Sequence, residues 1–122
     1  MKKARILVVE DDRASAELLL RLLAAKGHSA RAVDNAEDAA KALAAEAFDL
    51  VLLDHVLPGA TGMQSLGRLR GLSKAPIHLM SGYTGDDTRA DALLLGAAGF
   101  VPKPVDFTAL AALVEALPER PA

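Results

Sequence analysis

The sequence predicts an open, doubly wound α/β sheet in which five parallel strands alternate with five helices. Two features indicate this fold class. Short aliphatic runs recur along the chain and are apolar on both faces, as in parallel strands that helices cover on each side. Segments with apolar residues at helical spacing lie between these runs. The chain is 122 residues long, which is typical of one domain with a single core.

The strands are expected at four continuously apolar runs and at one alternating segment. Residues 30–33 alternate apolar residues with Arg31, a pattern typical of an edge strand with one wetter face. The continuous runs are 6–9, 50–53, 77–80 and 100–101. Because ligands of such sheets bind beyond the carboxyl ends of the strands, the residues that follow each run are the candidates for function.

The helices are expected between these strands, with Asp12 and Asn35 as N-caps of the first two. The third is the weakest, since Gly67 lowers its helical propensity. The expected ranges are 12–26, 35 to at least 43, 62–72, about 86–96 and 106–117. The expected buried lines are Ala14, Leu18 and Leu22 beside Leu19 and Leu23 in the first helix, and Leu110, Leu113, Val114 and Leu117 in the fifth.

Composition excludes several classes of protein. The chain has no cysteine, so it has no disulfide framework, thiolate metal site or cysteine nucleophile. Its formal net charge of −2 argues against a free-standing nucleic-acid binder. No apolar run approaches the roughly 20 residues needed to span a bilayer, and acidic residues follow the basic start too soon for a secretory signal. We therefore expect a cytoplasmic protein.

Polar residues follow four of the five expected strands. Glu10 and Asp11 follow the first, Asp54 the third, Ser81 the fourth and Lys103 the fifth. Three converging carboxylates would repel one another, and Mg²⁺ is the usual cation where so few carboxylates are offered. A lysine and a hydroxyl can bind a phosphoryl group beside them. Each residue alone would more often be a cap, a turn former or solvated surface, but their joint placement predicts a carboxylate that accepts a phosphoryl group.

Four separated motifs, with these residues among them, resemble the receiver domain of bacterial two-component response regulators. The motifs are 6–12 (ILVVEDD), 49–54 (DLVLLD) followed by Leu57-Pro58 and Gly62, 76–82, and 96–104 (GAAGFVPKP). The resemblance covers about 5–117 and implies a flavodoxin-like sheet with strand order 2-1-3-4-5. It also implies a receiver domain over 1–118, with 119–122 as a tail or the start of a linker.

The resemblance implies a role for each site residue. Asp54 would take a phosphoryl group from a phosphohistidine on a sensor histidine kinase or a histidine phosphotransfer protein. Asp11 would ligate Mg²⁺ directly, Glu10 directly or through water, and Asp54 and the backbone carbonyl of Val56 would complete the protein ligands. Lys103 would contact the phosphoryl group, and its peptide bond to Pro104 is expected to be cis.

Ser81 and Phe100 would form the switch pair of such a domain. The hydroxyl would move to the phosphoryl group and the ring would turn inward, which changes the face formed by the fourth helix, fifth strand and fifth helix. Ser81 stands where the family often has Thr, but the hydroxyl survives. Three consecutive leucines, 93–95, cover about 200° of the fourth helix, so at least one is expected to be exposed and to allow a partner or a homodimer there.

Val56 and Tyr83 lie two residues after the expected phosphoacceptor and the switch hydroxyl. In the family these positions influence how easily water attacks the acyl phosphate. The apolar and aromatic pair predicts a long-lived phosphoform. A Tyr83→Ala variant should therefore lose its phosphoryl group faster than the parent chain when the decay is followed by intact mass, and an equal rate would contradict the prediction.

Other readings of the sequence remain open. A phosphorylation-independent interaction module has the same fold, but it would normally have lost one of Asp54, Lys103 or the acidic pair. An aspartyl-phosphate hydrolase typically needs a second acid two residues after its nucleophile, where this chain has Val56. The chain is expected to be a switch rather than a conventional enzyme, and to pass its signal to a downstream protein or an output domain that these residues do not include. The three histidines lack credible metal spacing, and His78 is expected to be a core or helix-packed residue.

Overall fold

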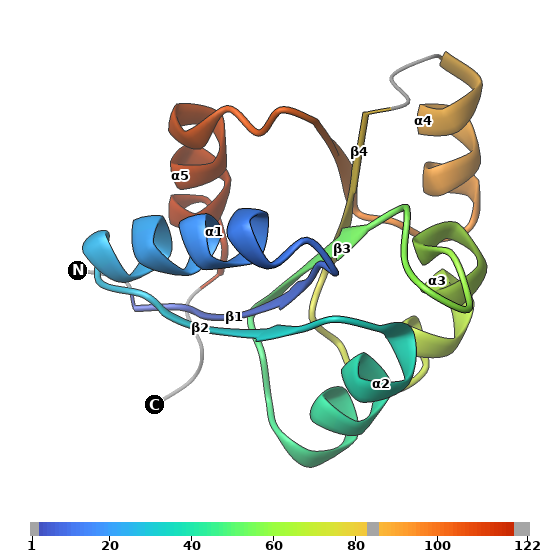
Figure 1. Ribbon diagram of the computed structural model, residues 1–122, viewed down its shortest axis with the longest axis horizontal. Coiled ribbons are helices and arrows are strands. Elements are labelled where there is room, and N and C mark those ends of the chain that lie inside the picture. The colour runs from blue at the N-terminus through green and yellow to red at the C-terminus, as the bar shows by residue number, and fades with distance from the viewer. Residues whose placement is uncertain (1–2, 83–85, 119–122) are drawn as a thin grey trace.

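A computed structural model describes residues 3–82 and 86–118. Over these residues the chain forms one parallel sheet with helices on both faces (Figure 1). The strands are β1 (Arg5–Val9), β2 (Ser29–Val33), β3 (Leu50–Asp54), β4 (Ile77–Ser81) and β5 (Gly99–Pro102). Their order in the sheet is β2-β1-β3-β4-β5, which confirms the predicted fold class and strand order.

Successive residues of the strands point to opposite faces of the sheet, and each face has its own apolar cluster. On one face Ile6, Val8, Leu50, Leu52 and Met80 pack with α1 (Arg13–Ala25) and α5 (Phe107–Glu115). On the other face Leu7, Val9, Val51, Leu53 and Leu79 pack with α2 (Ala36–Ala45), α3 (Gly62–Arg70) and α4 (Asp86–Leu94). Figure 1 shows α1 and α5 on one side of the sheet and α2, α3 and α4 on the other. Burial on both faces explains why these strands are continuously apolar.

The strand β2 lies at one edge of the sheet, as its alternating sequence predicted. None of its residues is fully buried, and Ser29 and Arg31 are exposed. Its neighbour β1 is buried over Ile6–Val9. The difference follows from position, because an edge strand has a partner on one side only.

The buried face of α1 differs from the expected one. Ala16, Leu19 and Leu23 are buried, whereas Ala14 and Leu18 are exposed. The line through Leu18 is offset by one residue, about 100° around the helix, from the line that faces the sheet. The first expected line is therefore wrong, and its neighbour through Leu19 is the core line.

The helix N-termini are held in different ways. Asn35 accepts a hydrogen bond from the backbone N–H of Asp38, which confirms it as the cap of α2. Asp12 stands at the N-cap position of α1, but its side chain makes no capping hydrogen bond and accepts one from Ser15 instead. A reciprocal capping box that was not predicted begins α3, and in it Thr61 and Gln64 each accept the other's backbone N–H. This box gives α3 a firm start despite Gly67.

Four helices end one or two residues earlier than expected. α1 ends at Ala25 rather than residue 26 and α3 at Arg70 rather than residue 72, while α4 ends at Leu94 rather than residue 96 and α5 at Glu115 rather than residue 117. Of the four residues of the expected stripe, Leu110, Val114 and Leu117 are buried, and Leu113 is partly buried against the same cluster. No helix in the described part of the chain is long and apolar enough to cross a membrane.

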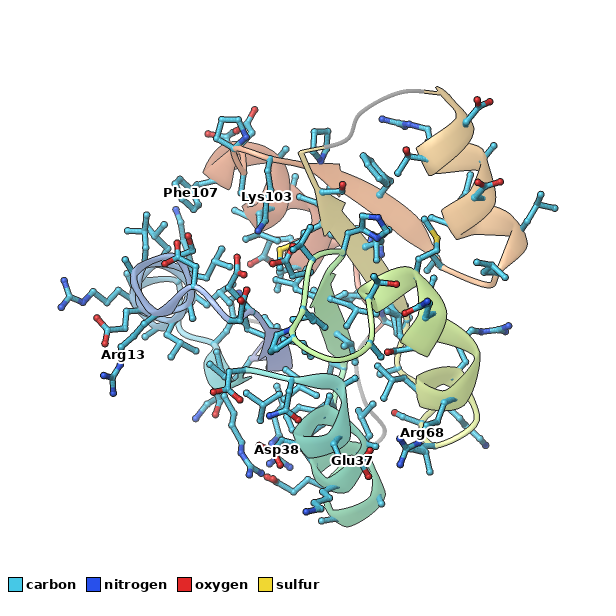
Figure 2. The ribbon with its side chains drawn as sticks, turned by 45° about the vertical axis from the view of Figure 1, so that its right-hand side comes forward. Arg13, Glu37, Asp38, Arg68, Lys103 and Phe107 are labelled. Atoms are coloured by element: carbon cyan, nitrogen blue, oxygen red, sulfur yellow. The ribbon has the colours of Figure 1, made fainter. Side chains whose placement is uncertain are left out.

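An ion pair ties α2 to α3 on the surface of the molecule. Arg68 donates to both carboxylate oxygens of Glu37 at 2.8 and 3.1 Å, and the two side chains point toward each other in Figure 2. Hydrogen bonding by Arg68 lowers the pKa of Glu37, and the same bond raises the pKa of Arg68. Both side chains are well exposed, so the pair contributes little to stability.

His78 and Gly99 form a tightly packed cross-strand pair. The two residues lie opposite each other in β4 and β5, and a Cβ atom on Gly99 would lie 2.5 Å from Nδ1 of His78. His78 is half-buried in a hollow that α5 also lines, and this burial lowers its pKa. His78 is thus neither a fully buried core residue nor a surface one, and it lies on the side of the sheet that α5 covers.

Gly99→Ala is expected to destabilise the protein by about 1–3 kcal/mol, because the new methyl group displaces the imidazole. His78→Ala should remove most of that cost, since it opens the space that the methyl group needs. Urea unfolding of both single variants and the double variant gives the coupling energy. Additive effects would show that the two side chains do not compete for the same space.

Candidate functional site

The acidic residues of the site lie at the carboxyl ends of β1 and β3. These strands are neighbours, and Val9 pairs with Leu53. The residues that come next after this pair, Glu10 and Asp54, therefore lie side by side. Carboxylate oxygens of Glu10, Asp11 and Asp54 lie within 4.8 Å of one another. Glu10 and Asp54 are buried and Asp11 is exposed. The sheet thus holds two carboxylates inside the molecule and one at its surface.

Lys103 completes the cluster from the segment after β5, where it is labelled in Figure 2. Its Nζ lies 2.7 Å from Oε1 of Glu10 and 3.0 Å from Oδ1 of Asp54. Its backbone N–H donates to the carbonyl oxygen of Ser81 at 2.9 Å, which fixes the segment against the end of β4. The Lys103–Pro104 peptide bond is cis, as expected.

The charges of the cluster do not balance. Burial is the largest effect on Glu10, and with a hydrogen bond to Asp54 it raises the pKa of Glu10 to about 7, although Lys103 opposes the shift. For Lys103 burial acts in the lowering direction, but hydrogen bonds and charge from Glu10 and Asp54 outweigh it and raise the pKa overall. One ammonium thus faces three carboxylates. The excess of hard oxygen donors around one point fits a small divalent cation.

The loop after β3 is bound closely to the strand end. The backbone N–H of Gly62 donates to the carbonyl oxygen of His55 at 2.9 Å. A Cβ atom on Gly62 would come 3.0 Å from the carbonyl carbon of Asp54 and closer still to its oxygen. The backbone N–H of Val56 lies 3.5 Å from Oδ1 of Asp54, and the Val56 side chain is 57% exposed. The loop therefore fixes the position of Asp54 through backbone contacts.

The expected switch residues lie on the two neighbouring strands. Ser81 is buried at the end of β4, and Phe100 is half-buried in β5 at the margin of the apolar cluster under α4. The guanidinium of Arg89, on α4, lies over the Phe100 ring with its Cζ atom 5.3 Å from the ring centroid. Arg89 was not among the site residues predicted from the sequence. Tyr83, whose shielding role was predicted, lies outside the described residues.

All three consecutive leucines at the end of α4 are exposed. The exposed fractions are 49% for Leu93, 84% for Leu94 and 48% for Leu95. The prediction that at least one would be exposed is confirmed. Leu95 escapes the core because α4 ends at Leu94 and the chain then turns at Gly96, which has a φ of +108°.

Two hollows open beside the acidic cluster. One of about 240 Å³ lies between α1 and the segment after β5, and Leu18, Lys103 and Phe107 are among its lining residues. Another of about 630 Å³ lies between the start of α1 and the start of α2, where Asp11 and Asp38 line it. Figure 2 labels Lys103 and Phe107 at the first and Arg13 and Asp38 at the second. The cluster is thus reachable from solvent.

The sequence model of the response regulator receiver domain matches residues 6–115. The chain belongs to the response regulator receiver family. Among curated proteins, the receiver is 44% identical over 112 residues to the response regulator protein FleR of Pseudomonas aeruginosa, covering 91% of this chain and 24% of FleR. It spans about a quarter to a half of the length of the curated relatives it matches.

Solved structures of response regulators have the same fold. A two-component response regulator from Clostridium difficile aligns with a TM-score of 0.89 at 26% identity, over 93% of each chain. A response regulator from Burkholderia pseudomallei, solved with a phosphorylated aspartic acid, calcium ion and citrate, aligns with a TM-score of 0.85 at 27% identity, over 93% of this chain and 67% of that one. Receiver domains bind Mg²⁺ at an acidic pocket, and Glu10, Asp11 and Asp54 form such a cluster in this one.

Proposed function

We propose that this receiver is a phosphorylation-dependent switch that accepts a phosphoryl group on Asp54 from a phosphohistidine of a sensor histidine kinase or a histidine phosphotransfer protein. One observation carries the proposal. Asp54 is buried at a strand end with the Lys103 ammonium 3.0 Å from its Oδ1 and two further carboxylates beside it. The phosphorylated aspartic acid in the Burkholderia pseudomallei relative supports it.

The transfer forms one bond and breaks one. An Oδ atom of Asp54 forms the bond to phosphorus as the phosphorus–nitrogen bond of the donor breaks. The imidazole nitrogen keeps the electron pair of that bond and is later protonated. Lys103 is placed to hydrogen-bond a phosphoryl oxygen, because its Nζ already lies between Glu10 and Asp54. Positioning and charge stabilisation are the main means of catalysis in such transfers.

Mg²⁺ is the cation proposed for the acidic cluster. Glu10, Asp11 and Asp54, with the backbone carbonyl of Val56, would hold it, Glu10 directly or through water. When bound it supplies positive charge to the oxygens of the transferred group. The three carboxylates fit this role because they are hard oxygen donors and exceed the one ammonium beside them.

The signal is proposed to leave through Ser81 and Phe100. The Ser81 hydroxyl would bind the phosphoryl group, and the Phe100 ring would move toward the space near Ser81, which alters the face formed by α4, β5 and α5. Exposed leucines at 93–95 give that face an apolar surface for a downstream protein, an output domain or a homodimer. We assign the receiver unit to residues 1–118 and a tail or the start of a linker to 119–122.

Incubation with acetyl phosphate and Mg²⁺, followed by intact mass, tests the proposal. The parent chain is expected to gain the mass of one phosphoryl group, and Asp54→Asn is expected to gain none. A parent chain that stays unmodified would favour a phosphorylation-independent interaction module. Continuous hydrolysis of unrelated phosphate esters would favour an aspartyl-phosphate hydrolase, and a phosphoryl group that persists in the Asn variant would place the modification elsewhere.

A further inference from the structure

The Phe100 ring has a cation above its face. Arg89, in the first half of α4, places its guanidinium carbon 5.3 Å from the ring centroid. This distance is within the range of cation–π attraction, in which the negative face of an aromatic ring attracts a guanidinium. No carboxylate whose side chain is described lies within 4.0 Å of that guanidinium, so the group that faces it is the ring.

The location of the contact matters more than its strength. Phe100 is half-buried at the edge of the apolar cluster, and Arg89 itself is exposed. Phe100 lies opposite Leu79 in the sheet, two positions before the pair formed by Ser81 and Pro102. A ring that moves toward Ser81 must leave its present place under the guanidinium. The contact can therefore exist in only one of the two positions of the ring.

We propose that Arg89 is a positioning residue that holds the Phe100 ring in its half-exposed place and so opposes the phosphorylated state. This inference rests on the proposed function, because it assumes that Phe100 moves when Asp54 is phosphorylated. A contact made in only one of two states shifts the equilibrium by its own free energy. Removal of the guanidinium then favours the inward ring, and by reciprocity it favours phosphorylation of Asp54.

Acetyl phosphate titration in the presence of Mg²⁺ measures this effect. Arg89→Ala is expected to lower the acetyl phosphate concentration for half-maximal phosphorylation by about two- to fivefold, the range that an exposed cation–π contact allows. Arg21→Ala is the matched control, because Arg21 is an exposed arginine on α1, on the opposite face of the sheet. It is expected to leave the titration unchanged.

A double-variant cycle separates this role from a general effect on the helix. In a Phe100→Leu background, Arg89→Ala is expected to change nothing, because the aromatic face is already absent. An effect of the same size in both backgrounds would overturn the proposal, and so would an Arg89→Ala titration that matches the parent chain. Arg89→Lys keeps the charge but loses the planar group, so it should fall between the two.

Fluorine NMR gives a readout that does not depend on phosphorylation. The chain has three phenylalanines, Phe48, Phe100 and Phe107, and 4-fluorophenylalanine labels each of them. In the unphosphorylated protein, Arg89→Ala is expected to shift the Phe100 resonance and leave the other two in place, whereas an unmoved Phe100 resonance would overturn the contact. If the resonance shifts but acetyl phosphate modifies no variant, the proposed function fails while the Arg89 contact stands.

Discussion

Raising the pH from about 5 to about 8 without a divalent cation is expected to destabilise the folded protein through Glu10 by an amount on the order of 2 kcal/mol. The pKa of Glu10 is raised from 4.5 to about 7, first by burial and then by Asp54. Between these two values the folded state holds a proton that the unfolded state has released. Glu10 therefore adds stability below about pH 4.5, and this contribution is lost as the pH rises through 7.

Urea unfolding in the presence of a chelator, over a series of pH values, measures this loss. Glu10→Gln is the matched control, since glutamine has a similar size but does not titrate. His78 acts in the opposite direction, because burial lowers its pKa in the folded protein. The unfolded state then holds more protons on His78 than the folded state does, so this residue makes the protein more stable as the pH rises toward 6.5. Both chains contain His78, so the difference between their profiles isolates Glu10. Parallel profiles for the two chains would contradict the prediction.

Mg²⁺ should reverse the loss at high pH. A cation that binds only the folded state stabilises it by an amount that grows with the logarithm of its concentration over its dissociation constant, and protons compete with the cation for carboxylates. Millimolar Mg²⁺ is therefore expected to stabilise the parent chain more at pH 8 than at pH 5. Glu10→Gln should show a smaller gain at pH 8. An equal gain in both chains would mean that Glu10 takes no part in binding the cation.

The meeting of the site residues at the strand ends could be predicted, because the carboxyl ends of parallel strands lie at the same edge of a sheet. Glu10 and Asp54 each end an apolar run, and the register of β1 against β3 puts them side by side. Lys103 follows from the same rule, since its strand ends at the same edge. This prediction needs only the apolar runs and the charged residues that follow them, and both are visible in the sequence.

Contacts between a helix and a strand were not predictable in the same way. Arg89 reaches Phe100 only because α4 is rotated about its own axis so that this side chain faces β5. The spacing of apolar residues in the sequence does not determine that rotation. The weak amphipathic pattern of α4, with three exposed leucines at 93–95, gives no clear signal of that rotation. The expectation for α1 was wrong for the same reason. Two neighbouring lines of apolar residues run along this helix, and only its packing against the sheet determines which of them is buried.

One missed feature did have a signal in the sequence. Thr61 followed three residues later by Gln64 is the pattern of a capping box, and it marks the start of α3. A different case is His28, which is buried and accepts a hydrogen bond from the backbone N–H of Ala4 at 3.1 Å. The residues next to His28 in the sequence give no signal of this contact, because Ala4 is 24 residues away from it.

Gly62→Ala is expected to cost about 3 kcal/mol of unfolding free energy and to reduce phosphorylation of Asp54. The new Cβ atom would lie 3.0 Å from the carbonyl carbon of Asp54, 3.1 Å from Cα of His55 and closer still to the Asp54 oxygen. All three atoms are backbone, so no side-chain rotation relieves the collision. The strand end and the start of α3 must move apart instead.

Gly67→Ala is the matched control for this change, because it places the same methyl group five residues later in the same helix. Apart from its chain neighbours and the backbone of its own helix, no atom lies within 4 Å of a Cβ there. Gly67 is exposed in the helix interior, so alanine should stabilise the protein by about 0.5–1 kcal/mol. Urea unfolding should thus give opposite signs for the two variants. Phosphorylation by acetyl phosphate should fall only in Gly62→Ala, even where both chains are fully folded, since only that collision displaces the backbone that carries Asp54. Normal phosphorylation of a folded but destabilised Gly62→Ala would show that the loop tolerates the shift without moving the carboxylate.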